Sequence, residues 1–290
     1  MLLINNNKIL LREIDNFRKL GKFINFIPTM GNLHLGHKSL FKKSQNNNEI
    51  RIVSIFVNPL QFNDYKDFND YPRTLELDKK KLSAEAVDIL FFPDSDIIKR
   101  MKFYFKLGNI SKKLCGIDRK GHFEGVAKII LIFLNLIKPD FITLGEKDYQ
   151  QLLVIKKIIK ESKIKTKVKS CPTVRNRDGV ALSSRNQLLG KKIFLAKYIP
   201  YVLKQITLEI TDGNFELKRL NYFKDFLEKT GIDKVHYLEI LNENDLTALT
   251  NVPCISRIFI AISIDGIRLI DNMRVGYKLA CIGKSLSIVR

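Results

Sequence analysis

Two of the four histidines in this chain, His34 and His37, lie three residues apart in the stretch PTMGNLHLGHKSL, beside Gly31 and Gly36. The apolar run FINFI precedes the stretch and is typical of a buried strand. Glycine permits a tight turn or a close approach of the backbone to a ligand. A helix that begins near His37 would offer free N–H groups and its positive dipole end to an anion. Imidazole groups would add side-chain donors, so the pattern predicts a phosphate site.

Two other interpretations of this stretch stay open from the residues alone. A helix cap followed by two surface histidines would need no ligand. A metal site is a second alternative, but it would need a third ligand, and none is nearby in the sequence. The HxGH pattern is moderately specific after a strand and weak without one.

The first 170 residues alternate between strand-like and helix-like segments. The patterns predict strands at 22–28, 51–59, 87–93, 140–148 and 163–171, and helices at 37–45, 72–85, 125–139 and 148–162. Strands separated by helices indicate an α/β fold with a parallel sheet that helices cover on both faces.

Polar segments follow three of these strands: PTMGNLHLGH, SIFVNPLQF and TLGEKDYQQ. In an open parallel sheet, ligands bind outside the carboxyl ends of the strands. We therefore expect the three segments to share one ligand site.

The pattern changes near residue 172. The polar, turn-rich stretch PTVRNRDGVALSSRNQ is followed by helix-like segments at 190–209 and 214–231, and by strand-like segments at 235–241, 256–264 and 267–273. These features predict a first domain over residues 1–172 and a smaller α+β domain over 173–290.

The formal net charge of +20 would suit a nucleic-acid-binding protein, with a basic and aromatic stretch at 99–120. However, the chain has 36 Lys against 14 Arg, and the excess Lys is spread along the whole chain. Arg is the residue that favours forked phosphate contacts and base stacking, so nucleic-acid binding is disfavoured. Small anionic substrates would benefit from the same positive field.

Composition also disfavours a membrane or disulfide-rich protein. The longest apolar stretch, 129–137, is about half of the length that a membrane span needs. The four cysteines, Cys115, Cys171, Cys254 and Cys281, form no CxxC pair and no zinc pattern, which favours reduced thiols. We expect a soluble, cytoplasmic protein.

HLGH is similar to the HxGH signature of nucleotidylyltransferases and class I aminoacyl-tRNA synthetases, which form adenylates at the α-phosphate of ATP. ALSSRN, residues 181–186, fits the mobile phosphate-binding loop of such enzymes. By itself, its serine pair would be read as a helix cap. The ordered motifs PTMGNLHLGH, SIFVNPLQF, DYPRTLELD, GHFEGV, LGEKDYQQL, PTVRNRDGVALSSRN and RLIDN together resemble the pantoate–β-alanine ligase family over nearly the whole chain.

The resemblance implies a Rossmann-like first domain, a smaller second domain that acts as a lid, a homodimer and a requirement for Mg²⁺. It also implies that pantoate attacks the α-phosphorus of ATP and releases pyrophosphate. β-Alanine then attacks the pantoyl adenylate, which gives AMP and pantothenate.

By the same resemblance, His34, His37 and Lys147 are the catalytic residues, and His37 is the one that families of this type treat as a proton donor. The implied ATP-binding residues are Met30, Gly31, Asn32, Leu33, His34, Leu35, Gly36, His37, Gly145, Glu146, Lys147, Asp148, Val174, Leu182, Ser183, Ser184 and Arg185. No direct protein ligand to the metal is expected. Asp148 is a candidate for a ribose hydroxyl or a magnesium-bound water, or else for the cap of the following helix.

Gln61, Gln151 and Asn58 are the implied pantoate-binding residues, and Gln61 is also assigned to β-alanine. Glutamine offers both donors and acceptors to hydroxyl and carboxylate groups. Asn58 precedes Pro59, so turn formation is its alternative role.

Other residues receive weaker assignments. Arg119 and His122 belong to a family segment near the mouth of the active site, and His236 is expected to be structural. Lys120, Leu144 and Leu182 stand where the family usually has Pro, Phe and Met. None of these departures removes a donor or a charge.

Overall fold

The computed structural model describes residues 1–43, 48–100, 105–250 and 255–275. The chain forms two compact units, Met1–Val174 and Arg175–Arg290, hereafter the N-terminal and C-terminal units. The unit boundary lies two residues after the domain boundary expected from the sequence.

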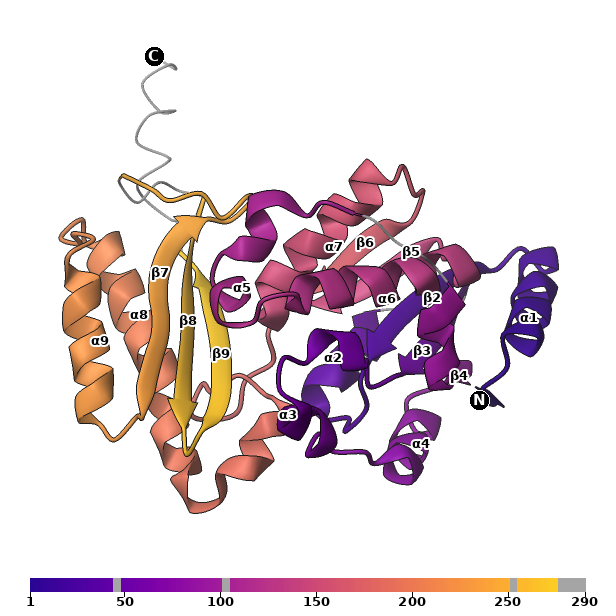
Figure 1. The fold of residues 1–290 in the computed structure, drawn as a ribbon, viewed down its shortest axis with the longest axis horizontal. Helices are drawn as coiled ribbons and strands as arrows, with labels where there is room; N and C mark the ends of the chain where they lie inside the picture. Colours follow the sequence, from indigo (N-terminus) through magenta and orange to yellow (C-terminus); the bar gives the residue numbers. More distant parts are fainter. Residues whose placement is uncertain (44–47, 101–104, 251–254, 276–290) are drawn as a thin grey trace, which may run out of the picture. The chain divides into compact units, whose positions relative to one another are not determined.

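The N-terminal unit contains a parallel six-stranded sheet (Figure 1) with the strand order β1-β4-β3-β2-β5-β6. The strands are β1 (Leu2–Ile4), β2 (Phe23–Thr29), β3 (Glu49–Ile55), β4 (Ile89–Phe91), β5 (Phe141–Gly145) and β6 (Lys167–Cys171). The order runs outward in one direction from β2 and in the other from β5. The sheet therefore has its topological switch point between β2 and β5, where ligands bind in folds of this type.

Helical segments connect these strands. The α-helices of this unit are α1 (Asn7–Lys19), α2 (Leu35–Lys43), α3 (Tyr65–Asn69), α4 (Leu75–Ser83), α5 (Cys115–Asp118), α6 (His122–Ile137) and α7 (Tyr149–Glu161). The 3₁₀ segments are η1 (Pro59–Gln61), η2 (Ser95–Arg100), η3 (Gly108–Lys112) and η4 (Glu146–Asp148).

Alternate strand residues point to opposite faces of the sheet, and helices cover both faces. Ile27 and Val53 pack in one cluster with Leu40 of α2 and Leu82 of α4. On the other face, the ring of Phe26 lies 5.3 Å from that of Phe133 of α6. Both faces are apolar because the strands are buried on both sides. The expected fold class is confirmed for this unit.

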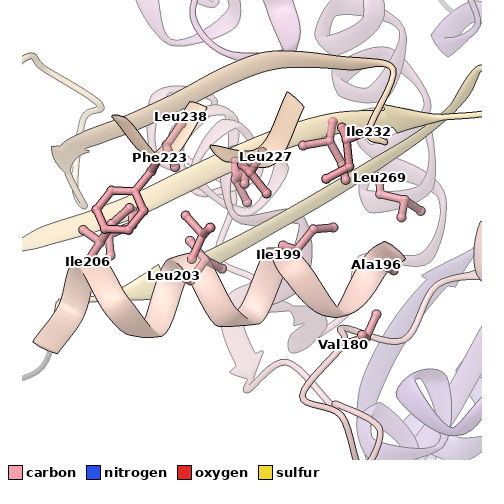
Figure 2. Packing of buried hydrophobic residues seen from close by; sticks show 14 of the residues in the cluster. Val180, Ala196, Ile199, Leu203, Ile206, Phe223, Leu227, Ile232, Leu238 and Leu269 are labelled. Carbon is pink, nitrogen blue, oxygen red and sulfur yellow. The ribbon is translucent and has the colours of Figure 1, made fainter. Parts of the chain in front are cut away.

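The C-terminal unit pairs an antiparallel sheet with helices. Its elements are η5 (Ser184–Lys197), α8 (Tyr198–Thr211), α9 (Arg219–Lys229), β7 (Lys234–Asn242), β8 (Ser256–Ile264) and β9 (Ile267–Arg274), and β8 is the central strand. Figure 2 shows Ile199, Leu203 and Ile206 on one side of α8, in a buried cluster with Leu238 of the sheet. Their helical spacing gives this unit its own apolar core, as expected for an α+β domain.

Three details differ from the sequence-based expectation. The elements β1, α1, α3 and α5 were not predicted. Helix α2 begins at Leu35, so His37 lies inside its first turn and does not start it. The segment expected as one helix over 190–209 is divided between η5, which is interrupted at Gly190, and α8. Within the described residues, no helix is both long enough and apolar enough to cross a membrane.

Candidate active site

The loop between β2 and α2 is held in a tight, left-handed conformation. Gly31 has φ +81° and Asn32 has φ +48°, and the left-handed region is costly for most side chains. The Thr29 hydroxyl donates to the Ser54 carbonyl at 2.7 Å and accepts from the Gly31 N–H at 3.3 Å. We call residues 30–34 the phosphate loop.

Asp78 of α4 also stabilises the phosphate loop. Its carboxylate accepts the N–H of Asn32 and the N–H of Leu33, each at 2.8 Å, and the hydroxyl of Thr74 at 3.0 Å. Asp78 is fully buried, and a buried carboxylate must be compensated by donors of this kind.

The sequence pattern around Asp78 indicates its role, although Asp78 lies in none of the three polar segments expected to share one ligand site. Asp78 lies on the same face of α4 as Leu75 and Leu82, because residues at i, i+3 and i+7 align on a helix. An acidic residue in the middle of a buried apolar stripe indicates a specific buried partner. Here, the partner is the backbone of a loop 45 residues away in sequence.

The two histidine rings contact each other and the backbone of the helix start. The ring centroids of His34 and His37 are 4.1 Å apart. Nδ1 of His34 accepts the N–H of Gly36 at 3.1 Å, and Nδ1 of His37 accepts the N–H of His34 at 3.2 Å. Because each Nδ1 is an acceptor, each neutral ring carries its proton on Nε2.

These contacts correct one detail of the sequence-based expectation. A helix beginning near His37 was expected to offer free N–H groups to an anion, and the N–H groups of Gly36 and His37 lie at this point. The structure uses the first for the His34 ring and the second for the His34 carbonyl, at 2.9 Å. Donation to a ligand at this point therefore falls to the Nε2–H groups.

Burial keeps the two imidazoles neutral. It lowers the pKa of His34 from 6.5 to about 4, with Lys147 and Lys81 as further causes and Asp148 opposing them. Burial, then the neighbouring His34, Lys147 and Lys81, lowers the pKa of His37 to about 3. At neutral pH, both histidines are uncharged donors beside two lysines.

Lys147 and Asp148 form η4 at the carboxyl end of β5, next to β2 in the sheet. Lys147 is mostly buried, and its Nζ lies 3.8 Å from Oδ1 of Asp148, which is half exposed. The side chain of Asp148 makes no capping bond to α7. The sheet therefore brings the expected cation to the same edge as the histidine pair.

Gln61 joins the phosphate loop to the segment after β3. Its Nε2 lies 2.8 Å from Sδ of Met30, and its Oε1 accepts Nδ2 of Asn58 at 3.2 Å. Asn58 is buried, donates also to the Gly125 carbonyl at 3.1 Å and accepts the Leu60 N–H. The amide of Asn58 is thus committed to the fold, and it positions Gln61.

Arg119 and His122 converge on the backbone of Gln61. Arg119 donates to the Gln61 carbonyl at 3.1 Å, and Nδ1 of His122 lies 2.7 Å from the same oxygen. These two residues, which had only a weak assignment from sequence, contact the segment that carries Gln61.

Gln151 lies in the first turn of α7 and is partly exposed, whereas its neighbour Gln150 is buried. The amide of Gln150 donates to the carbonyls of Ile110 and Lys113 and accepts the N–H of Cys115. Gln150 therefore anchors the segment around η3, a role that its sequence position did not reveal.

Leu144 is buried in β5 and Lys120 is exposed, so both departures from the family pattern are accommodated.

The candidate phosphate-binding loop ALSSRN belongs to the C-terminal unit, and Val174 is the last residue of the N-terminal unit. Ser183 accepts the N–H of Arg185 and caps η5, while Leu182, Ser184 and Arg185 are partly exposed. Ahead of this loop, Arg175 makes a bidentate pair with Asp271 of β9, at 2.6 and 3.0 Å. That pair ties the PTVRNRDG and RLIDN motifs together.

Other expected residues have structural partners. Nε2 of His236 lies 2.7 Å from Oγ of Ser263, as expected for a structural histidine.

Cys115 and Cys171 are buried and unbridged, whereas Cys254 and Cys281 lie outside the described residues. The basic stretch at 99–120 is also described only in part. In the described ranges, no three potential ligands gather in a metal-binding cluster.

Comparison with known proteins decides the family. A family model described as pantoate-beta-alanine ligase matches residues 3–274. The chain belongs to the pantoate–β-alanine ligase family. It is 39% identical over 271 residues to a pantothenate synthetase of Thermodesulfovibrio yellowstonii, across 92% of this chain and 97% of the relative.

Solved structures of this family have the same fold. The pantothenate synthetase of Thermus thermophilus superposes with a TM-score of 0.86 at 31% identity, over 96% of this chain and 100% of that one. The pantoate-beta-alanine ligase of Francisella tularensis, complexed with beta-gamma ATP and beta-alanine, gives 0.81 at 36% identity, over 96% and 99%. The expected activity, an ATP-dependent ligase reaction of pantothenate biosynthesis that joins pantoate to β-alanine, is confirmed by these comparisons.

Proposed function

We propose that the chain forms pantothenate in two steps through a pantoyl adenylate. In the first step, a carboxylate oxygen of pantoate bonds to the α-phosphorus of ATP, and pyrophosphate leaves. In the second step, the amine of β-alanine bonds to the acyl carbon, AMP leaves and the amine loses a proton. The resulting bond is the amide of pantothenate.

The observation that carries this proposal is the convergence of His34, His37 and Lys147 at the switch point between β2 and β5. Two Nε2–H donors and an ammonium group fit a phosphate chain. A carboxylate with a reference pKa of about 4 is already ionised at neutral pH, so the first step needs no general base. Catalysis then consists of positioning and of stabilising charge on the α-phosphoryl group and the departing pyrophosphate.

Three polar side chains in the N-terminal unit are assigned to pantoate. Gln61 lies against Met30 of the phosphate loop, so a substrate held by Gln61 would lie beside the nucleotide. Gln151 supplies a second amide. Asn58, the third residue that the resemblance assigns to pantoate, also positions Gln61. Gln61 also serves the β-alanine site.

The remaining assignments concern the nucleotide. Residues 30–37 and 145–148 of the N-terminal unit are assigned to ATP, as are Val174 and Leu182–Arg185. The resemblance assigns the C-terminal unit the role of a lid. Mg²⁺ would be held chiefly by the ATP phosphates, as this cation prefers, and would offset their negative charge. The half-exposed carboxylate of Asp148 fits an outer contact to a magnesium-bound water.

We also propose that the enzyme is a cytoplasmic homodimer that acts on small molecules and has no nucleic-acid or membrane partner. The scattered thiols fit a reducing compartment. Sedimentation analysis of the purified chain tests the dimer, and a monomer at micromolar concentration would refute it.

Exchange of labelled pyrophosphate into ATP tests the central proposal. We expect exchange that requires pantoate and does not require β-alanine, and release of AMP when both substrates are present. With pantoate labelled with ¹⁸O in its carboxylate, one labelled oxygen should appear in AMP. Formation of ADP, or exchange without pantoate, would contradict the adenylate mechanism.

A further inference from the structure

Helix α4 holds both polar groups of one residue of the phosphate loop. The N–H of Leu33 donates to Oδ1 of Asp78 at 2.8 Å, and the carbonyl of Leu33 accepts Nζ of Lys81 at 2.6 Å. Asp78 and Lys81 are three residues apart and share a face of the helix. The residue held in this way immediately precedes His34.

Lys81 is not simply the counter-ion of Asp78. The carboxylate of Asp78 already receives two N–H groups and one hydroxyl at 3.0 Å or less. Nζ of Lys81 stays 4.0 Å from that carboxylate, and its side chain is half exposed. An ammonium group has three donors, so the one on Leu33 leaves others directed elsewhere.

The charge of Lys81 acts on the histidine pair. It contributes, less than burial and Lys147 do, to the lowered pKa of His34 and of His37. Charges interact this way only at short range through a poorly screened medium. An anion that accepts hydrogen bonds from the two histidines would therefore also lie in the field of Lys81.

We propose that Lys81 is a further ATP-binding residue, whose ammonium group contacts the polyphosphate while Asp78 positions the phosphate loop beneath it. The proposal deepens the ATP site described above and rests on that assignment. It gives the site cations from two elements, since Lys147 follows β5 and Lys81 belongs to α4. The ligand chemistry is the anionic polyphosphate, not the nucleoside.

The experiment compares Lys81→Met with Lys80→Met, which removes the same charge from an exposed position on the same helix. Binding of a non-hydrolysable ATP analogue is measured by calorimetry, and binding of adenosine by competition. We expect Lys81→Met to weaken the analogue by at least ~10-fold and to leave adenosine unchanged, because a lost phosphate contact spares the nucleoside. Lys80→Met should resemble the wild type, and Lys81→Arg should recover most of the affinity.

Asp78→Asn provides the contrast that a positioning residue requires. In this variant an NH₂ group replaces one carboxylate oxygen, so a donor faces a backbone N–H that had been accepted. The phosphate loop should therefore shift, and both the analogue and adenosine should bind more weakly. If Lys81→Met weakened the binding of both ligands equally, Lys81 would act only by contacting the loop, and the proposal would be overturned. An unchanged affinity for the analogue would also overturn it. These binding measurements test the role of Lys81 alone. Failure of the adenylate mechanism would instead appear as absent pyrophosphate exchange in the wild-type enzyme.

Discussion

The carbonyl oxygen of Leu60 lies so close to Gly125 that a Cβ added at position 125 would be 2.1 Å from it. Helix α6 and η1 therefore contact each other through the backbone. Asn58 donates to the carbonyl of Gly125 in the same contact, and Asn58 in turn positions Gln61. A glycine in α6 thus sets the position of the Gln61 amide, which we propose to bind pantoate.

Gly125→Ala should displace η1 and raise the KM for pantoate more than the KM for ATP. We expect a loss of about 1–3 kcal/mol in the free energy of unfolding, as is typical of overpacking. Asn135→Ala, at an exposed position of α6, is the control and should change neither KM. Steady-state kinetics and urea unfolding measure both effects, and an unchanged KM for pantoate would contradict the role of this contact.

The imidazoles of His34 and His37 should stay neutral across the physiological pH range. Their pKa values are lowered to about 4 and about 3 in the free protein, so their ring resonances should not titrate between about pH 5.5 and 8. Nuclear magnetic resonance of the imidazole nitrogens measures this and also reports the Nε2–H tautomer. Titration of either ring near pH 6.5 would be inconsistent with the partly buried, backbone-bonded arrangement.

His37→Ala should slow pantoate-dependent pyrophosphate exchange by at least ~10²-fold, by analogy with other donors to a transition state. His37→Gln keeps a side-chain N–H and should recover part of the rate. His236→Ala removes a histidine of the C-terminal unit and serves as the control, with exchange near the wild-type rate. Circular dichroism checks that each variant is folded. Near-normal exchange in folded His37→Ala would contradict the role of His37 as a donor to the transition state.

The histidine pair should make the protein sensitive to acid. In the unfolded chain these histidines have the ordinary pKa of 6.5, whereas folding lowers the values to about 4 and about 3. The unfolded state therefore binds more protons below pH 6.5, and the free energy of unfolding falls as the pH drops toward 4. The neutral pair incurs no such penalty above this window.

Urea unfolding at several pH values measures this dependence, and His37→Gln should reduce its slope. Other groups that titrate in the same window affect the variant and the wild type alike. Identical slopes for the two proteins would show that His37 does not contribute.

Arg175→Met should destabilise the C-terminal unit, because it leaves the buried carboxylate of Asp271 without its guanidinium partner. Breaking a buried ion pair from one side typically costs about 3–5 kcal/mol. The KM for ATP should also rise, since the pair anchors the segment that leads to Ser183 and Arg185. Arg177→Ala, at an exposed position of the same turn, is the matched control.

The double variant Arg175→Met/Asp271→Leu removes both charges and should recover most of the lost stability. Denaturant unfolding and pyrophosphate exchange are the measurements. A loss of stability in Arg175→Met no larger than in Arg177→Ala would contradict the structural role of the pair.

The sequence predicted the elements that position the site because their patterns are local. The strands before PTMGNLHLGH and GEKD are apolar runs that end in polar turns, and the switch-point rule then places His37 and Lys147 at one edge. The sequence also contains signals for helix α1 that were not used to predict it. The side chain of Asn6 accepts the N–H of Lys8 and caps a helix whose buried residues, Leu10 and Ile14, are one turn apart.

What the sequence did not predict depends on partners far away along the chain. The bond of Asp78 to the phosphate loop spans 45 residues, and that of Asn58 to Gly125 spans 67. Motif spacing carries no information on which backbone groups such side chains meet. The neutral state of the histidines likewise follows from burial, which depends on how the whole unit packs.

The left-handed turn at Gly31 and Asn32 limits how this segment could be transplanted into another protein. Residues 28–40 look like a self-contained module, but the turn takes its donors and acceptors from Ser54, Asp78 and Lys81. Transplanting the segment alone onto another strand and helix would carry over both histidines without the contacts that shape the backbone between them and the strand. All three partners lie in the run from β2 through α4, about one-fifth of the chain, so a transplant would need at least that run to keep the turn.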